Sequence, residues 1–468
     1  MLQNFVPSRR KFLQSMGNGF GSIAFANMLA SETKANDFSP TPIRNFPSKI
    51  RSVVWFFLDG GPSHIDLLDP KPALDKLAGK PLPPSFNKPQ TAMGITANTP
   101  LLASKRKFKQ HGKSGIWMSD WLPHLSRQAD DIAVLRSCVG EGLTHVAGVS
   151  QMNTCSTLPG RPSLGAWSVY GLGKESEELP SFVVLSDRRG DVPGGSRNWG
   201  SGFIPATFQG TRFLDGPDPV LFHSPPQQIQ PLRQRQKINY LNWMNEYRKN
   251  QSTPTDRLDA RIASYELAWK MQTSIPQVID FSKETKETLN LYGVENEITK
   301  PAGRACLLAR RLVESGVRFI QVYLGNGSAW DAHSDLEGNH STLCKQTDQP
   351  VAAFLADLKR RGLLEETLVI WGGEFGRTPM SESGDGRDHN PWGFSMLFAG
   401  GGVKAGSTVG STDDIGLYAV DRPAPIRDIH ATILRIAGLE NNLLTYKHNG
   451  RDERATVNDA EIIEELLA

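Results

Sequence analysis

Four short runs of almost uninterrupted apolar residues stand out along the chain, each rich in β-branched and aromatic side chains. They occupy positions 53–58, 319–324, 367–371 and 394–399. Runs of this length without polar alternation are typical of strands covered on both faces, as in a parallel sheet. The pattern therefore predicts an α/β protein built around a mainly parallel sheet.

Helical signals lie between these runs. Four segments are predicted as helices: 122–131, 163–173, 303–315 and 348–361. The last two end at Gly316 and Gly362, and glycine commonly closes a helix. Two shorter apolar stretches, around Val134 and at 182–185, predict further strands.

The chain divides into a core in two parts, 51–186 and 301–468, separated by a segment of different amino-acid composition. From 187 to 300, loops rich in Gly and Pro give way to a stretch rich in Gln, Asn, Lys and Glu. Apolar residues are spaced there as in amphipathic helices: Leu258, Ile262, Tyr265, Leu267 and Trp269. We expect this segment to be an inserted helical cap over the site and not an independent domain.

The first 35 residues carry an export pattern. The motif SRRKFL at 8–13 matches the twin-arginine signal, and the mildly apolar stretch 16–30 is too short for a stable membrane span. A Pro-containing linker follows at 36–50. We therefore expect the twin-arginine translocation machinery as a partner and a mature protein in the periplasm or outside the cell, without a membrane-spanning segment.

Composition narrows the function classes. A chain of 468 residues with 38% hydrophobic residues can build a large core. The net charge of only +3, with no Lys/Arg stripe interleaved with aromatics, argues against a nucleic-acid partner. The four cysteines lack the spacing of a zinc finger or a redox motif. The class that remains is an enzyme-sized globular protein.

Acidic residues and histidines follow three of the predicted strands and precede the fourth. They are Asp59, Asp331, His333, Glu374 and His389. Because open α/β sheets bind ligands at the carboxyl ends of their strands, we expect these side chains to share one edge. Their mixed oxygen and nitrogen atoms suit one or two divalent cations, with Zn²⁺ and Mn²⁺ favoured. Each residue taken alone is more simply a helix cap, a solvated charge or a buried histidine.

Long motifs between about 51 and 454 carry a family resemblance. They are FFLDGGPSHIDLLDPKP, WDAH, GGEFGRTP, GRDHNPWGFSMLFAGGGVKAG and LTYKHNGRDER. They resemble the DUF1501 family, a bacterial group related to sulfatases and the alkaline phosphatase superfamily. The resemblance implies a doubly wound, mainly parallel sheet of the alkaline-phosphatase-like type, with a two-metal site for phosphate or sulfate esters.

The resemblance also implies roles for the candidate ligands. Asp59 matches the aspartate after the first strand. Asp331 and His333 fall where relatives place an aspartate and a histidine of one metal site, and His389 matches its later histidine. Glu374 stands where relatives usually carry Asp-His. This departure leaves one metal only, or favours a harder second ion such as Mg²⁺, Ca²⁺ or Mn²⁺.

The nucleophile is less defined by sequence. The sulfatase signature C/S-x-P-x-R is absent, and positions 157–161 have only the form T-x-P-x-R. Thr144 is the better match to the family nucleophile, with His145 beside it as a ligand or an acid. Two alternatives stay open: Thr144 caps a helix, or a metal-activated water is the attacking group.

Two further side chains are candidates for substrate binding. Arg377 could hold an anionic ester in a bidentate manner, with ordinary salt bridging as the alternative. His64 could lie near Asp59 and orient a ligand, while its neighbour Ser63 could equally begin a helix.

Two functions are consistent with these features. The first is an exported metal-dependent hydrolase of the sulfatase or alkaline phosphatase type. Its substrate would be a phosphate or sulfate ester, either a small molecule or a polysaccharide. The second is a non-catalytic metal-binding relative used for ligand binding or assembly.

The export signal has a direct test. Replacing Arg9 and Arg10 by lysine should leave the precursor in the cytoplasm, because the receptor recognises the paired guanidinium groups and not charge alone. Cell fractionation and immunoblotting measure the outcome. Normal accumulation of the double variant outside the cytoplasm would contradict the assignment.

Overall fold

The computed structural model describes residues 45–89, 99–188, 190–214, 219, 231–249, 267, 269–271, 274–325 and 327–468. The predicted export signal at 1–35 and most of the linker lie outside these residues, as do Leu258, Ile262 and Tyr265 of the predicted cap. The statements about the signal therefore stay predictions.

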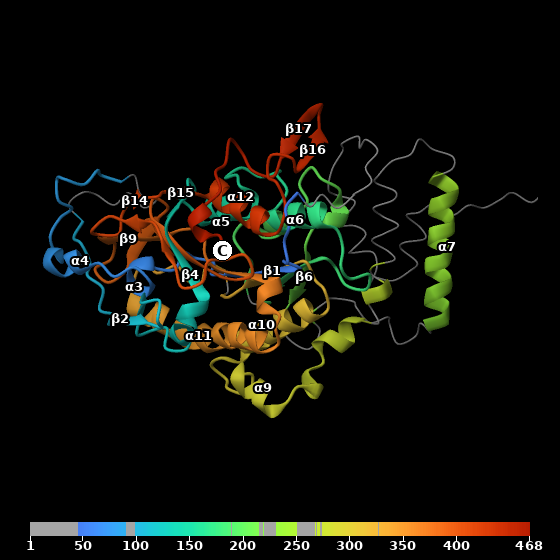
Figure 1. Ribbon diagram of the computed structural model, residues 1–468, viewed down its shortest axis with the longest axis horizontal. Helices are drawn as coiled ribbons and strands as arrows, with labels where there is room; N and C mark the ends of the chain where they lie inside the picture. Colours follow the sequence, from blue (N-terminus) through green and yellow to red (C-terminus); the bar gives the residue numbers. More distant parts are fainter. Residues whose placement is uncertain are drawn as a thin grey trace, which may run out of the picture.

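A nine-stranded sheet forms the centre of the described part of the chain (Figure 1). Its order is β12-β4-β11-β8-β1-β7-β5-β6, with β15 also paired to β4. The strands are β1 (Ser52–Phe57), β4 (Ile132–Val139), β5 (Phe182–Ser186), β6 (Thr211–Leu214), β7 (Phe319–Tyr323), β8 (Thr367–Gly372), β11 (Phe394–Gly400), β12 (Thr408–Val409) and β15 (Ala424–Pro425). Only β11 runs antiparallel to its neighbours, so the predicted mainly parallel α/β sheet is confirmed.

Helices cover both faces of the sheet, which explains why its strands are apolar throughout. Alternate residues of β1 enter two different cores: Val54 and Phe56 pack on one side, and Trp55 and Phe57 on the other. The first side is covered by α10 (Lys300–Glu314) and α11 (Leu336–Arg360), and the second by α5 (His145–Thr154), α6 (Leu164–Leu172) and α12 (Ile426–Ile436). Figure 1 shows these two groups on opposite sides of the strands.

The remaining elements are small. Short hairpins are formed by β2 (Phe108–His111) with β3 (Ile116–Ser119), β9 (Gly376–Ser381) with β10 (Arg387–Asn390), β13 (Ser411–Thr412) with β14 (Ala419–Asp421), and β16 (Thr445–His448) with β17 (Arg451–Arg454). The other helices are α3 (His64–Leu67), α4 (Pro72–Leu77), α7 (Pro231–Lys249) and α9 (Lys286–Leu291), with 3-10 turns η1 (Leu125–Asp131), η2 (Gly195–Trp199), η3 (Ala206–Phe208), η4 (Phe281–Lys283), η5 (Leu364–Glu366) and η6 (Glu464–Leu466). None of the described helices has the length and apolar character needed to cross a bilayer.

Two predicted helices differ from the structure. The segment 122–131 forms the 3-10 helix η1 and not an α-helix. The helix predicted at 348–361 begins twelve residues earlier, at Leu336, and continues through Pro350. The predicted helix began at Asp348, which lies inside the observed one. Its carboxylate instead accepts hydrogen bonds from the backbone N–H groups of His124 and Leu125, at 2.7 and 2.8 Å, and so caps η1.

The segment 187–300, predicted as an insertion, contributes one strand to the central sheet. Strand β6 lies at 211–214 and pairs in parallel with β5. The helices α7 and α9 follow, and Figure 1 shows α7 beyond β6, away from β4. Whether this segment covers the site stays a prediction.

Strand direction brings several loops to one edge of the sheet. The carboxyl ends of β1, β7, β8 and β4 point the same way, and the amino end of the antiparallel β11 lies at that edge too. The predicted arrangement of strand ends and one strand entrance is therefore the observed one. Ligand sites of open α/β sheets form at such an edge.

Candidate metal centre

The loops at this edge carry all five predicted metal ligands and one more histidine. Asp59 follows β1, His145 begins α5 after β4, Asp331 and His333 follow β7, Glu374 follows β8, and His389 lies in β10 just before β11. Four of these residues, His145, Asp331, His333 and His389, place ligand atoms within 4.8 Å of one another.

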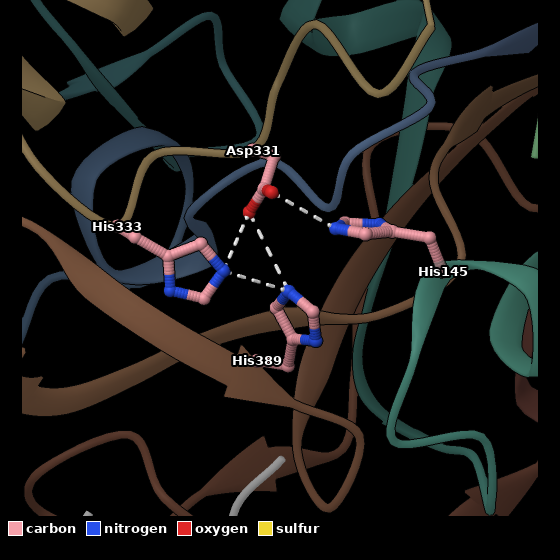
Figure 2. Close-up of side chains that lie close together, drawn as sticks. All are labelled: His145, Asp331, His333 and His389. Carbon is pink, nitrogen blue, oxygen red and sulfur yellow. Dashed lines mark hydrogen bonds and ion pairs between the residues drawn. The ribbon is translucent and has the colours of Figure 1, made fainter. Parts of the chain in front are cut away.

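Asp331 lies at the centre of this group. Its Oδ2 lies 3.1 Å from Nε2 of His145, and its Oδ1 lies 3.0 Å from Nε2 of His333 and 3.4 Å from Nε2 of His389. Figure 2 shows the three rings turned toward the one carboxylate. The Nε2 atoms of His333 and His389 are themselves only 3.1 Å apart.

The opposite nitrogen of each ring is already engaged. Nδ1 of His389 lies 2.7 Å from the carbonyl oxygen of Leu143, and Nδ1 of His145 lies 2.8 Å from Oε1 of Glu374. Nδ1 of His333 contacts Oε2 of Glu382. A carbonyl or carboxylate oxygen only accepts, so each Nδ1 must donate its proton. In the neutral rings the lone pairs of all three Nε2 atoms therefore face Asp331.

Lone pairs and a carboxylate at these distances repel one another unless a proton or a metal ion lies among them. The donor set, three imidazole nitrogens and one carboxylate oxygen, is one that Zn²⁺ or Mn²⁺ accepts. In addition, Nε2 of His145 is buried without a hydrogen bond to any described residue. The residues present thus fit a divalent metal ion.

A second group of oxygens lies beside the first. Asp59 and Glu374 are each 1% exposed. Oδ2 of Asp59 accepts from the N–H of Ser328 at 2.8 Å, and Oε1 of Glu374 accepts from the N–H of Gly60 at 2.9 Å. Their other oxygens are buried and have no hydrogen-bond partner in the described part of the chain. Burial, and then the charge of Glu374, raises the pKa of Asp59 to about 6. Two buried, unpartnered carboxylate oxygens suit an oxygen-preferring second cation.

Glycines let these loops approach so closely. Gly60 has φ +116°, and a side chain there would collide with the backbone at Trp330 and Asp331. Gly61 has φ +78°, and a side chain there would collide with the ring of Phe375. That ring stacks on His389 at 4.4 Å between centroids. The glycine pair after β1 thus allows both the approach of the Asp331 loop and the packing behind the histidines.

The sequence comparison identifies the family. The family model described as a protein of unknown function, DUF1501, matches residues 50–467. The chain belongs to the DUF1501 family. No curated protein matches the sequence.

Several solved structures have a similar chain course. They include Ps i-CgsB in complex with k-i-k-neocarrahexaose (12% identity, 83% of this chain and 72% of that chain, TM-score 0.36), the PsFucS1 sulfatase from Pseudoalteromonas sp. (13%, 93% and 73%, 0.35) and alkaline phosphatase from the Antarctic bacterium TAB5 (10%, 84% and 99%, 0.36). These TM-scores are too low to support conclusions about the site, which rest on the geometry of this chain alone.

The side chain of Arg377 in this DUF1501 protein is not available to bind a substrate, as its predicted role would require. Its side chain is fully buried. It donates from Nε to the carbonyl of Gly61 at 2.8 Å, from Nη1 to the carbonyl of Arg387 at 3.1 Å, and from Nη2 to Oδ1 of Asp331 at 2.6 Å and to the carbonyl of Gly60. The guanidinium group is committed to the protein, so the structure supports the salt-bridge alternative and not bidentate ester binding.

The hydrogen bonds around Asp331 keep it ionised. Burial alone would raise the pKa of its carboxyl group. Contacts with the three histidines, together with the positive charge of Arg377, outweigh burial and hold this pKa well below its usual range. The carboxylate of Asp331 is therefore negatively charged at neutral pH.

His64, also predicted to contact substrate, is buried behind the site. It begins α3, its Nε2 lies 2.9 Å from the carbonyl oxygen of Gly416, and its ring packs against Gly376 of β9. Burial lowers the pKa of His64 to about 4, so the ring is neutral. The structure therefore corrects the prediction, because this histidine supports β9 and does not face a ligand.

Thr144 occupies the N-cap position of α5, directly before His145. Its carbonyl accepts the N–H of Gly148 at 2.8 Å, but its side chain makes no cap hydrogen bond and is exposed. The helix-cap interpretation is thus right for the backbone. The hydroxyl group itself is left available at the edge that carries the metal candidates.

Sequence reasoning missed Glu382 and Asp388, which form a second potential ligand group with His333. Both residues belong to the β9–β10 hairpin. Asp388 lies inside the quoted motif GRDHNPWG, but Glu382 lies in the polar turn between two motifs. A polar turn is a common solvent-exposed feature, so no local signal distinguished Glu382 from its neighbours.

Removing the charge of Arg377 should destabilise the fold. Arg377→Met leaves Asp331 and the carbonyls of Gly60 and Gly61 without their donor, and we expect a loss of about 2–4 kcal/mol in the free energy of unfolding. Asp331 is partly exposed, and solvent screening keeps this value below that of a fully buried pair.

Urea denaturation followed by circular dichroism measures the change. Arg451→Met is the control, because Arg451 is 83% exposed and its ion pair is long, at 3.8 Å. The control should shift stability by about 0.5 kcal/mol or less. Equal losses in the free energy of unfolding for the two variants would contradict a role of Arg377 in holding Asp331 and the glycine carbonyls.

Proposed function

We propose that this DUF1501 protein is a metal-dependent hydrolase of phosphate or sulfate esters. One observation carries the proposal: three imidazoles, each with Nδ1 engaged by an acceptor, direct Nε2 at the single carboxylate of Asp331. Three nitrogens and a carboxylate that converge in this way match the ligand set of a catalytic divalent cation.

The residues divide into two ligand sets. The nitrogen-rich set would hold Zn²⁺ or Mn²⁺ and consists of His145, Asp331, His333 and His389. Asp59 and Glu374 supply the oxygen-rich set for a second ion such as Mg²⁺, Ca²⁺ or Mn²⁺. Cations held there would polarise the ester and lower the pKa of an attacking hydroxyl group.

Thr144 is the proposed attacking group. Its hydroxyl makes no cap hydrogen bond, and it lies at the positive end of α5, which favours a developing alkoxide. The Thr144 oxygen would bond to the phosphorus or sulfur atom as the bond from that atom to the alcohol oxygen breaks, and the alcohol leaves with a proton. Water would then hydrolyse the ester formed on Thr144, which releases phosphate or sulfate and restores the hydroxyl group. Water in place of the Thr144 hydroxyl is the alternative, and the variants below separate the two.

The substrate is an anionic ester of a small molecule or a polysaccharide. Arg377 cannot neutralise it, since its donors are committed within the protein. The negative charge of the ester must therefore be met by the bound cations and the amino end of α5. With the export motif at 8–13, we place the reaction in the periplasm or outside the cell.

The commitment of Arg377 also favours a second candidate, a non-catalytic metal-binding relative used for ligand binding or assembly. In that case the ligand set would be retained for structure, and no residue would be required to bind an ester. Metal content and turnover together distinguish the two functions.

Loss of one histidine should remove metal and stability together. His333→Ala deletes a ligand nitrogen, and binding energy to the folded state is also stabilisation. We expect the melting temperature of the wild type to rise on addition of Zn²⁺ or Mn²⁺ and that of the variant to respond much less. His111→Ala, in the β2–β3 hairpin, is the control and should respond like the wild type.

The same melting experiment should depend on pH. In the absence of metal, burial lowers the pKa of His145, but its contacts with Asp331 and Glu374 outweigh burial and raise the pKa to about 9. A pKa raised above the unfolded value of 6.5 gives stability that is complete below pH 6.5 and is lost as the pH rises through about 9. Metal should therefore stabilise most at the upper end of this window, where protons no longer compete. A wild type that never responds to divalent ions would contradict the proposal.

Substitutions at two positions test the chemistry with aryl phosphate and aryl sulfate substrates. Asp59→Asn should reduce kcat/KM by about 100-fold or more, because it removes charge at the second ligand set. Thr144→Ala should do the same if the hydroxyl attacks, while Thr144→Ser should retain activity. Hydrolysis that survives Thr144→Ala but not Asp59→Asn identifies water as the attacking group. Bound metal without turnover on any such ester would instead support the binding function.

A further inference from the structure

The three site histidines differ in what holds their Nδ1 atoms. His389 is held by a backbone carbonyl and His145 by the buried Glu374. His333 is held by Glu382, a side chain that comes from none of the strand ends at the site. The two side chains are 25% and 20% exposed, so this is the most accessible of the three contacts.

Glu382 is fixed in place by the hairpin that contains it. Strands β9 and β10 pair so that Arg377 lies opposite His389, and the N–H of Glu382 donates to the carbonyl of Gly386 at 3.3 Å. Gly386 packs so closely on the backbone of His333 that a side chain there would collide with it. The β9–β10 hairpin therefore carries Arg377, which contacts Asp331, the candidate ligand His389, and Glu382, the partner of His333.

Two further contacts attach the turn to the loop after β7. The N–H of Arg387 donates to the carbonyl of Ala332 at 2.9 Å, and Asp385 accepts from the N–H of Asp335 at 3.0 Å. These contacts leave Glu382 facing one imidazole.

We propose that Glu382 is a positioning residue for the metal centre, an inference that rests on the proposed function. Its carboxylate accepts the Nδ1 proton of His333, fixes the ring orientation and presents the Nε2 lone pair to the ion. A carboxylate in this position also makes the imidazole a stronger donor to the metal. Glu382 touches neither the cation nor the ester in this role.

A separate ion between His333, Glu382 and Asp388 is the competing arrangement. Nδ1 of His333 contacts Oε2 of Glu382, and a nitrogen that donates its proton to a carboxylate has no lone pair for an ion. Asp388 is also engaged, because its Oδ1 accepts the N–H of His389 at 2.7 Å. The geometry therefore favours the positioning role.

Metal affinity is the first readout. Co²⁺ and Zn²⁺ binding is measured by competition with a chromophoric chelator, and the visible spectrum of bound Co²⁺ reports ligand geometry. Glu382→Ala should weaken binding by about 10–100-fold and alter the Co²⁺ spectrum. Glu382→Gln, whose amide oxygen still accepts but carries no charge, should weaken it less.

Asp385→Ala is the matched control. Asp385 helps to attach the turn, so Asp385→Ala should lower Co²⁺ affinity less than Glu382→Ala does. Ser383→Ala is the neutral control, because Ser383 is exposed in the same turn, and its Co²⁺ affinity should stay within about twofold of the wild type. Wild-type affinity and spectrum in both Glu382 variants would overturn the proposal. Loss of a whole metal equivalent with the remaining ion unaltered would also overturn it, because Glu382 would then be a ligand of its own ion.

The ring tautomer is a second readout that needs no metal. Nitrogen-15 NMR of the metal-free protein, at a pH where the rings are neutral, should show His333 protonated at Nδ1 in the wild type. In Glu382→Ala the population should shift toward protonation at Nε2. This shift in a protein that binds no metal would defeat the proposed function but leave the Glu382–His333 contact established, and its absence would overturn the positioning role even where metal binds.

Discussion

The carboxylate of Asp331 is the contact on which the rest of the site depends. Four groups from three segments meet on its two oxygens: three imidazoles and the guanidinium group of Arg377. The start of α5, the loop after β7 and the β9–β10 hairpin supply them. The charge of the carboxylate gives these groups a common partner, and it persists because their contacts outweigh the effect of burial.

The sheet makes this meeting possible. Strands β1, β7 and β8 lie side by side and parallel, so the loops that carry Asp59, Asp331 and Glu374 leave the same edge. Apolar packing on both faces fixes these strands, and the absence of a side chain at Gly60 allows two of the loops to touch. The polar site is thus positioned by a rigid apolar scaffold, the arrangement that catalytic and binding loops generally require.

Much of this arrangement is readable from sequence, for a physical reason. A run such as that of β1 is apolar because both faces are covered, and the carboxyl ends of parallel strands share one edge, so the positions of Asp59, Asp331, His333, Glu374 and His389 follow from strand pattern alone. The functions of Arg377 and Glu382 do not follow. The acceptors of Arg377 are carbonyls of Gly60 and Gly61, more than 300 residues away, and nothing in the local sequence reports such a partner. His64 was misassigned for the same reason, since its partner is the carbonyl of Gly416.

The charge of the site explains why it favours a cation. The site contains four carboxylates, those of Asp59, Asp331, Glu374 and Glu382. The guanidinium group of Arg377 contacts one of them, Asp331. His145 connects the two halves, with Nδ1 on Glu374 and Nε2 facing Asp331. Without metal, burial and then the charge of Glu374 raise the pKa of Asp59 to about 6, and contacts with Asp331 and Glu374 outweigh burial and raise that of His145 to about 9. In the proposed function a divalent ion would replace the protons bound by these groups, and the rings could keep their orientations because each Nδ1 is already held. The same contacts that order the metal-free site therefore prepare it for metal.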